Sequence, residues 1–117
     1  MDLRSIRFKA KRLDGKGWAI GDFLHSYENG AIIVPIEGGG AFSVDPSTVC
    51  QFTGLKDTND VPIFEGDIID FDGEGEVVFK YGAFYAKFGK YTECLLCNLV
   101  KSGLSVTIVC NKFDKEK

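Results

Sequence analysis

The stretch VVFKYGAFYAKF at residues 77–88 decides the fold class, because strand-like alternation stands on both sides of a tight turn. Tyr81-Gly82 supplies the turn of a β-hairpin. Successive side chains of a strand point to opposite faces, so Tyr85 and Lys87 are predicted to face outward. The opposite face, predicted to enter the core, carries Phe84, Ala86 and Phe88.

The same alternation recurs along most of the chain, whereas sustained helical periodicity is nearly absent. At 6–11 the face with Ile6, Phe8 and Ala10 is apolar, and the other face carries Arg7, Lys9 and Lys11. Further strands are predicted in WAIGDFLH (18–25), AIIVPI (31–36), FSV (42–44), VCQFT (49–53) and SVTIVCN (105–111). Asn29-Gly30 is typical of a hairpin turn between two of them. These short strands predict a mostly β protein, a small partly closed β-barrel or a sheet folded on itself.

One segment departs from this pattern and predicts a single short helix. It is YTECLLCNLVKSG at 91–103, with Thr92 as the N-cap and Lys101 and Gly103 at the end. One helical face would carry the apolar side chains Leu95, Leu96, Leu99 and Val100.

Length and composition predict one domain over residues 1–117 with one core and a frayed tail at 114–117. The hydrophobic fraction of 44% and the charged fraction of 26% are those of an ordinary soluble globule. No apolar run is long enough for a bilayer, and MDLRSIRFKAKRL has no apolar signal core, so we expect a cytoplasmic protein without membrane contact. The net charge of -3 combines basic ends with an acidic middle, which opposes nucleic-acid binding.

The cysteines are predicted to be free thiols that pack as small hydrophobic side chains. Cys94 and Cys97 have the spacing of half a zinc site, but Cys50 and Cys110 stand far apart and form no second close pair. His25 is interpreted as a surface or turn residue. We therefore expect no metal and no cofactor.

Within an acidic stretch at 65–76, the segment that starts at Asp70 begins like a calcium loop, but its twelfth position is Tyr81, where a bidentate Glu is required. Its carboxylates are interpreted as the solvated side of a hairpin. An enzyme using Glu65 and Asp67 as a carboxylate pair is an alternative, although Gly66 between them favours a turn.

A second alternative is a nucleic-acid-binding accessory factor. Lys80, Tyr85 and Lys87 combine cations with an aromatic ring, and the basic N-terminal strand would extend this surface.

The segment QFTGLKDTNDVPIFEGDII at 51–69 resembles the signature of the YopX-like family of small phage and prophage proteins. The matching residues are Gln51, Phe52, Thr53, Gly54, Leu55, Lys56, Asp57, Ile63, Phe64, Glu65, Gly66, Asp67, Ile68 and Ile69. IRFKA at 6–10, VDPSTV at 44–49 and VTIVCNKFD at 106–114 are also similar to parts of the family pattern. The resemblance implies a β-rich, partly closed barrel-like fold and a phage or prophage origin, and it brings no established activity.

The combined interpretation is a non-enzymatic binding protein with a phage or host protein as partner, which self-associates through a sheet edge. The motif residues predicted to be structural are Thr53, Gly54, Leu55 and Gly66, with Asp57 and Asp67 tying turns. The candidate binding residues are Lys56, Asp57, Glu65, Asp67, Lys80, Tyr85 and Lys87, and no catalytic residue is assigned.

Overall fold

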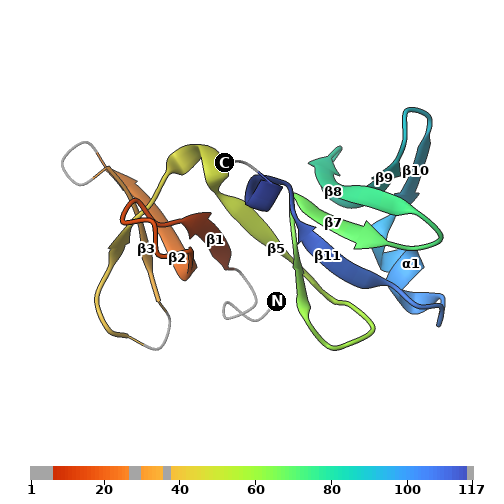
Figure 1. Cartoon of the computed structure of the whole chain (residues 1–117), viewed down its shortest axis with the longest axis horizontal. Coiled ribbons are helices and arrows are strands. Elements are labelled where there is room, and N and C mark those ends of the chain that lie inside the picture. Colours follow the sequence, from red (N-terminus) through yellow and green to blue (C-terminus); the bar gives the residue numbers. More distant parts are fainter. Residues whose placement is uncertain (1–6, 27–29, 36–37, 116–117) are drawn as a thin grey trace. The chain divides into compact units, whose positions relative to one another are not determined.

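The computed structural model describes residues 7–26, 30–35 and 38–115. The chain divides into two compact units, residues 1–52 and 53–117 (Figure 1). Each unit has its own cluster of buried hydrophobic residues. The described residues thus form two hydrophobic clusters, and the single domain over residues 1–117 stays a prediction.

The first unit contributes five strands to a six-stranded sheet with the order β4-β3-β2-β1-β5-β6, whose last strand comes from the second unit. Its strands are β1 (Phe8–Lys11), β2 (Trp18–Ser26), β3 (Gly30–Val34), β4 (Phe42–Ser43) and the start of β5 (Cys50–Lys56). A single 3-10 turn, Pro46–Thr48, precedes β5, and the Asp45 side chain caps it by accepting a hydrogen bond from Ser47 N. The predicted Asn29-Gly30 turn between β2 and β3 falls partly on residues 27–29, which lie outside the described residues.

Alternation along β1 separates its two faces as predicted. Ala10 is fully buried, and Phe8 packs against the core of the first unit. Lys9 and Lys11 lie on the other face, since they pair in register with Ile20 and Trp18 of β2. The core cluster consists of Ala10, Ala19, Ala31, Ile33 and Val44, with Phe8, Phe23, Phe42 and Val49 packed against it.

The end of β1 also bonds to the segment around β4, which partly closes this sheet. Leu13 N donates to Ser43 O over 2.9 Å, and Asp45 N donates to Lys11 O over 2.9 Å. Between these bonds lies a β-bridge from Arg12 to Val44. The partly closed sheet agrees with the predicted fold class.

The second unit contains a five-stranded antiparallel sheet with the order β10-β9-β8-β7-β11. The strands are β7 (Asp67–Asp70), β8 (Glu74–Lys80), β9 (Ala83–Phe88), β10 (Thr92–Leu95) and β11 (Thr107–Asn111). Strand β6 (Pro62–Phe64) and the last residues of β5 come before this sheet in the chain, and a 3-10 turn (Lys112–Lys115) follows it. The fold is thus mostly β, as predicted, with two antiparallel sheets rather than one closed barrel among the described strands.

The hairpin at 77–88 forms as predicted. Val77 pairs with Ala86 and Phe79 with Phe84, across a turn at Tyr81-Gly82. Val77 and Ala86 enter the core of the second unit and Phe84 and Phe88 pack against it, whereas Phe79 is 48% exposed. The buried members of that core are Ile63, Ile69, Val77, Ala86, Leu96, Leu99 and Val106.

Among the described residues one short helix is present, but its predicted start is wrong. Helix α1 covers Leu96–Lys101, and Leu95, not Thr92, is its N-cap. Residues 92–95 instead form β10, because they pair antiparallel with Phe88 to Tyr85 of β9. Leu96 and Leu99 of the predicted apolar face are buried in the core.

Candidate functional site

The Asp57 side chain of the signature motif is buried and holds two segments of the second unit together. Its Oδ1 accepts hydrogen bonds from Asn59 N and Val61 N, each over 2.9 Å. Its Oδ2 accepts a hydrogen bond from Ile108 N of β11 over 3.1 Å. Beside it Thr58 N donates to Val106 O, and Val106 N donates to Thr58 Oγ1, both over 2.8 Å. The turn after β5 therefore binds the last strand.

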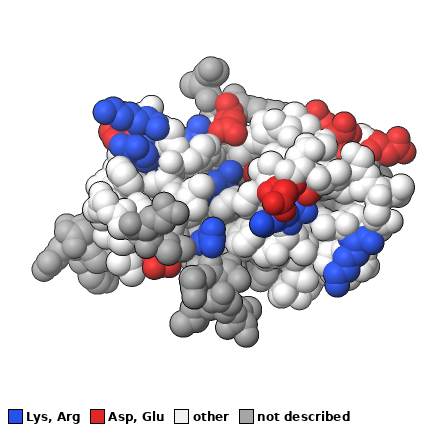
Figure 2. All heavy atoms as spheres, turned by 90° about the horizontal axis from the view of Figure 1, so that it is seen from below, with Lys and Arg blue, Asp and Glu red and all other residues white. Residues whose placement is uncertain are grey.

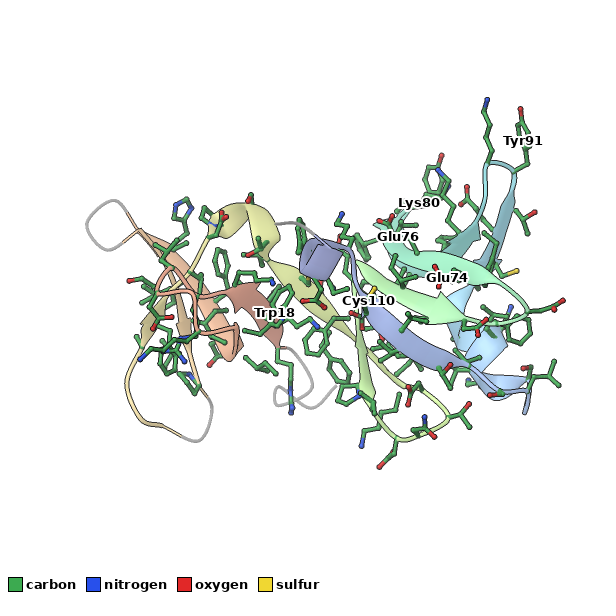
Figure 3. The ribbon with its side chains drawn as sticks, in the orientation of Figure 1. Trp18, Glu74, Glu76, Lys80, Tyr91 and Cys110 are labelled. Atoms are coloured by element: carbon green, nitrogen blue, oxygen red, sulfur yellow. The ribbon has the colours of Figure 1, made fainter. Side chains whose placement is uncertain are left out.

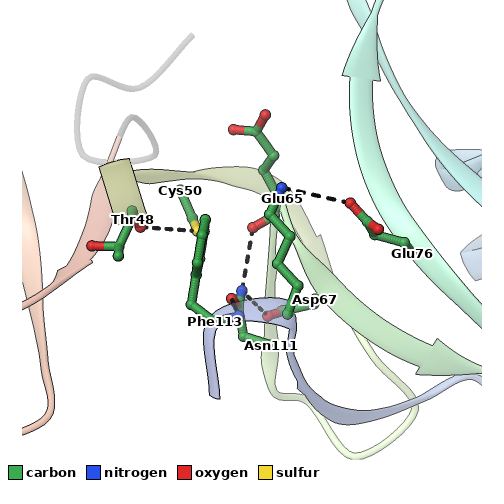
Figure 4. Close-up of polar contacts among 8 residues, drawn as sticks. Thr48, Cys50, Glu65, Asp67, Glu76, Asn111 and Phe113 are labelled. Carbon is green, nitrogen blue, oxygen red and sulfur yellow. Dashed lines mark hydrogen bonds and ion pairs between the residues drawn. The ribbon is translucent and has the colours of Figure 1, made fainter. Parts of the chain in front are cut away.

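Asp67 makes a second tie to the same strand (Figure 4). Only 2% of Asp67 is exposed, and its Oδ2 accepts a hydrogen bond from Phe64 N over 2.8 Å. Asn111 Nδ2 donates to Asp67 Oδ1 over 3.0 Å and to Glu65 O over 3.4 Å. Lys112 N donates to Gly66 O over 2.8 Å. The turn between β6 and β7 is thus joined to the end of β11.

Of the remaining motif residues, Gly66 lies in the turn between β6 and β7, and Thr53, Gly54 and Leu55 lie within β5. Gly54 and Gly66 have φ values of 84° and 87°, a backbone region that favours glycine. A Cβ on Gly66 would also lie 3.2 Å from Asn111 Nδ2. Thr53 Oγ1 donates to Ile63 O over 2.8 Å, and Leu55 packs against the core. The structural role of the motif stays a prediction, which the stability of its variants tests.

The carboxylates of Glu65 and Asp67 do not form an open pair on an extended strand. Glu65 and Gly66 are the turn between β6 and β7, and Asp67 begins β7. Glu65 is half-buried, and Asp67 is buried with hydrogen bonds to its oxygens. The other motif candidate, Lys56, is exposed, and its Nζ lies 3.7 Å from Asp60 Oδ1.

A different surface gathers the remaining candidates. Cross-strand partners share a face of the sheet, so the register defines one side that points away from the core. This side, here called the outer face, carries Ile68, Glu76, Val78, Lys80, Tyr85, Lys87, Glu93, Leu95 and Cys110. Figure 3 marks Glu76 and Lys80 on β8 and Cys110 on β11. Lys80, Tyr85 and Lys87, predicted from the hairpin, therefore lie on one surface.

The outer face carries both ion-paired and exposed charges, and the register also places the exposed Asp70 and Glu74 on it. Lys80 forms an ion pair with Glu93 of β10, and its Nζ lies 5.7 Å from the centroid of the Tyr85 ring. The hydrogen bond that Lys80 donates to the Glu93 carboxylate raises the pKa of Lys80 above its ordinary value. Lys87 lies between two acids, because it pairs in register with Glu76 on one side and Glu93 on the other.

An apolar row crosses the same face between these charges. Val78 pairs with Tyr85, and Tyr85 pairs with Leu95 at the edge of the sheet. Ile68 and Cys110 pair in the neighbouring row, where Lys112 Nζ lies 3.7 Å from Glu76 Oε2. Val78, Tyr85, Ile68 and Cys110 are half-buried, and 36% of Leu95 is exposed. The outer face therefore has an apolar row, with the ion pairs Lys80–Glu93 and Lys112–Glu76 beside it.

Sequence reasoning missed Glu93, Glu76 and Asn111 as partners within these sites. Glu93 was assigned to a helix, and Glu76 was counted only within an acidic stretch. Asn111 gave no signal, because its partners Glu65 and Asp67 are distant in sequence.

The basic N-terminal strand also has its cations engaged with aromatic rings. Lys9 Nζ lies 4.5 Å and Lys11 Nζ lies 5.2 Å from the centroid of the Trp18 ring. On the face seen in Figure 2, Lys and Arg side chains are scattered among uncharged atoms, with Asp or Glu beside several of them.

All cysteines are free thiols, and Cys50 is buried while Cys94, Cys97 and Cys110 are half-buried. Across residues 7–26, 30–35 and 38–115, no group of three His, Cys, Asp or Glu side chains is placed to hold a metal ion. His25 is exposed, as predicted. No helix in the described part of the chain has the length and apolar character needed to cross a membrane.

Comparison with known proteins gives a family but no individual relative. No curated protein and no solved structure matches the chain. The family model described as "YopX protein" matches residues 19–117. This match covers most of the chain, including the motif at 51–69 and the whole of the second unit. The protein therefore belongs to the YopX family.

Proposed function

We propose that this YopX-family chain is a non-enzymatic protein-binding module of phage or prophage origin. It acts in the bacterial cytoplasm, binds a phage or host protein through the outer face, and self-associates. The observation that carries the proposal is the apolar row Val78, Tyr85 and Leu95, which lies on the same face as the Lys80–Glu93 ion pair. The partner that this surface fits is a folded protein with an apolar patch and few unpaired charges.

The composition of the outer face supports protein rather than small-molecule binding. Protein interfaces have an apolar centre, a polar rim and an enrichment in tyrosine. Tyr85 occupies such a centre, since Val78 and Leu95 flank it within the sheet. The Lys80–Glu93 ion pair beside it provides the polar rim. Tyrosines in this setting carry much of the binding energy in measured interfaces.

An enzymatic function has less support from the motif. Asp57 and Asp67 are buried, and their oxygens accept hydrogen bonds that hold turns and β11. A carboxylate used in this way is engaged within the fold and is not directed to a substrate. The motif thus supports the architecture on which the outer face is built.

Nucleic-acid binding is the second candidate, because Lys80, Lys87 and Tyr85 do share one face. Binding of this kind depends on cations that neutralise phosphates. Glu93 already compensates Lys80, and Glu76 and Glu93 flank Lys87. We expect a dissociation constant weaker than about a micromolar for single strands at physiological salt. Fluorescence anisotropy with a labelled oligonucleotide tests this, and tight, steeply salt-dependent binding that Lys87→Glu abolishes would establish the second candidate.

The protein-binding proposal is tested with Tyr85→Ala against the matched control Tyr91→Ala. Tyr91 lies in the turn between β9 and β10 and is 88% exposed (Figure 3). Tyr91→Ala therefore removes a tyrosine from the same unit as Tyr85 without changing the apolar row of the outer face. Tagged chains are purified from infected or lysogenic cells, and the partner retained by the wild type is then titrated in purified form.

We expect Tyr91→Ala to bind that partner like the wild type and Tyr85→Ala to bind at least about tenfold more weakly. Circular dichroism verifies that both variants are folded. Equal binding of the partner by Tyr85→Ala and the wild type would show that the outer face is not the binding surface.

A further inference from the structure

We propose that strand β10 pairs antiparallel with β10 of a second copy of this chain, in the register that places Cys94 opposite Cys94. This inference rests on the self-association in the proposed function, and it specifies the edge and the register. The second sheet would then continue from one copy into the other across a two-fold axis.

The two edges of the second sheet differ in how they are covered. The motif turns cover β11, where Ile108 N donates to Asp57 Oδ2 over 3.1 Å. Close to it, Val106 exchanges two hydrogen bonds with Thr58, and Lys112 N donates to Gly66 O. Another chain therefore cannot use these groups of β11 without breaking the tie to the motif.

Strand β10 stands at the opposite edge of the sheet. Within the described part of the chain, β9 is its single strand partner. In an antiparallel ladder alternate residues direct their N–H and C=O groups to the far side, so β10 presents such groups outward. Thr92, Glu93 and Leu95 are exposed, and no proline or lysine interrupts the strand. An open edge of this kind favours pairing with an identical strand.

The faces of the sheet restrict the register of that pairing. A two-fold axis perpendicular to the sheet keeps outer residues on the outer face, so a residue can stand opposite only residues of its own face. Centring the pair on Glu93 would place two glutamates opposite each other, which is unfavourable. Centring it on Cys94 places Glu93 of one copy opposite Leu95 of the other. This second register avoids the like-charge contact and covers the exposed side chain of Leu95.

The same register predicts opposite effects for two charges at one position. Leu95→Glu would place a glutamate opposite Glu93 of the second copy twice, once on each side of the axis. Leu95→Lys would place a lysine opposite the same Glu93. Val109→Glu is the control, because Val109 lies on β11 at the other edge and is 51% exposed.

Sedimentation velocity over a range of protein concentrations measures the dimer dissociation constant of each full-length variant. We expect Leu95→Glu to raise it by about tenfold, and Leu95→Lys to leave it unchanged or to lower it. Val109→Glu is expected to match the wild type. A wild type that stays monomeric at all concentrations, or a dimer that only Val109→Glu weakens, would overturn the proposal.

A second measurement on the wild type does not depend on any variant. Treatment with a short bis-maleimide is expected to join two chains through Cys94, and mass spectrometry of the peptides identifies the linkage. A dimer whose cross-links join other cysteines and never Cys94 contradicts the register. The outer-face proposal fails separately, since Tyr85→Ala tests partner binding and is expected to leave the dimer intact.

Discussion

Replacing Asp57 with alanine is expected to lower the free energy of unfolding by about 3 kcal/mol, because buried donors lose their acceptor. Asp57 accepts hydrogen bonds from Asn59 N, Val61 N and Ile108 N. The first two close the turn after β5, and the third holds β11 in the sheet. At this chain length the melting midpoint is expected to fall by roughly 10 °C in differential scanning calorimetry.

Two further variants separate the hydrogen bonds of Asp57 from its charge. Asp60→Asn removes the same charge from the same turn at a side chain that is 83% exposed, and it is expected to change stability by less than about 0.5 kcal/mol. Asp57→Asn keeps one oxygen acceptor but directs an amide N–H₂ at a backbone donor. It is therefore expected to destabilise the protein strongly. An unchanged or higher melting midpoint for Asp57→Ala would mean that the motif is a functional site held under strain.

The turn-forming role of the motif could be predicted from local sequence, but its long-range partners could not. Glycines before and between acidic residues indicate turns, and Gly54 and Gly66 do have positive φ. The ties to β11, however, join Asp57 to Ile108 and Asp67 to Asn111, which are 51 and 44 residues apart. The periodicity within one strand or helix does not predict contacts between residues so far apart in the sequence.

The start of the helix was ambiguous for a related reason. Residues 92–95 fit the first turn of a helix by composition, with Thr92 as a typical N-cap. In the structure they pair with β9, and Glu93 reaches Lys80 of β8. Pairing with a neighbouring strand overrides a weak local preference. Because Glu93 was placed in a helix, the sequence did not predict its ion pair with Lys80.

Alternation predicted which residues of the hairpin lie on each face, but not the surroundings of the outward ones. Tyr85 and Lys87 do share the face opposite Ala86. Their acidic neighbours Glu76 and Glu93 come from other strands, so a basic and aromatic segment in sequence becomes a compensated surface in the fold. This change of environment is the reason that protein binding is preferred to nucleic-acid binding here.

Gly21 in β2 shows a constraint that a strand pattern does not reveal. It reads as one residue of the alternating segment WAIGDFLH. In the structure the chain that leaves β3 lies directly against it. A Cβ added to Gly21 would lie 2.2 Å from Val34 O and 2.8 Å from the Cα of Pro35. Both are backbone atoms, so a rotamer change cannot relieve the contact.

Gly21→Ala is therefore expected to lower the free energy of unfolding by about 3 kcal/mol or more, because the main chain after β3 must move. Trp18, the one tryptophan of the chain, lies in the same unit, so its fluorescence during urea unfolding measures the effect. Asp22→Ala, at an exposed neighbouring position, is the control and is expected to unfold within about 0.5 kcal/mol of the wild type. If Gly21→Ala instead unfolds at the same urea concentration as Asp22→Ala, the close approach of Val34 and Pro35 to β2 is not part of the folded structure.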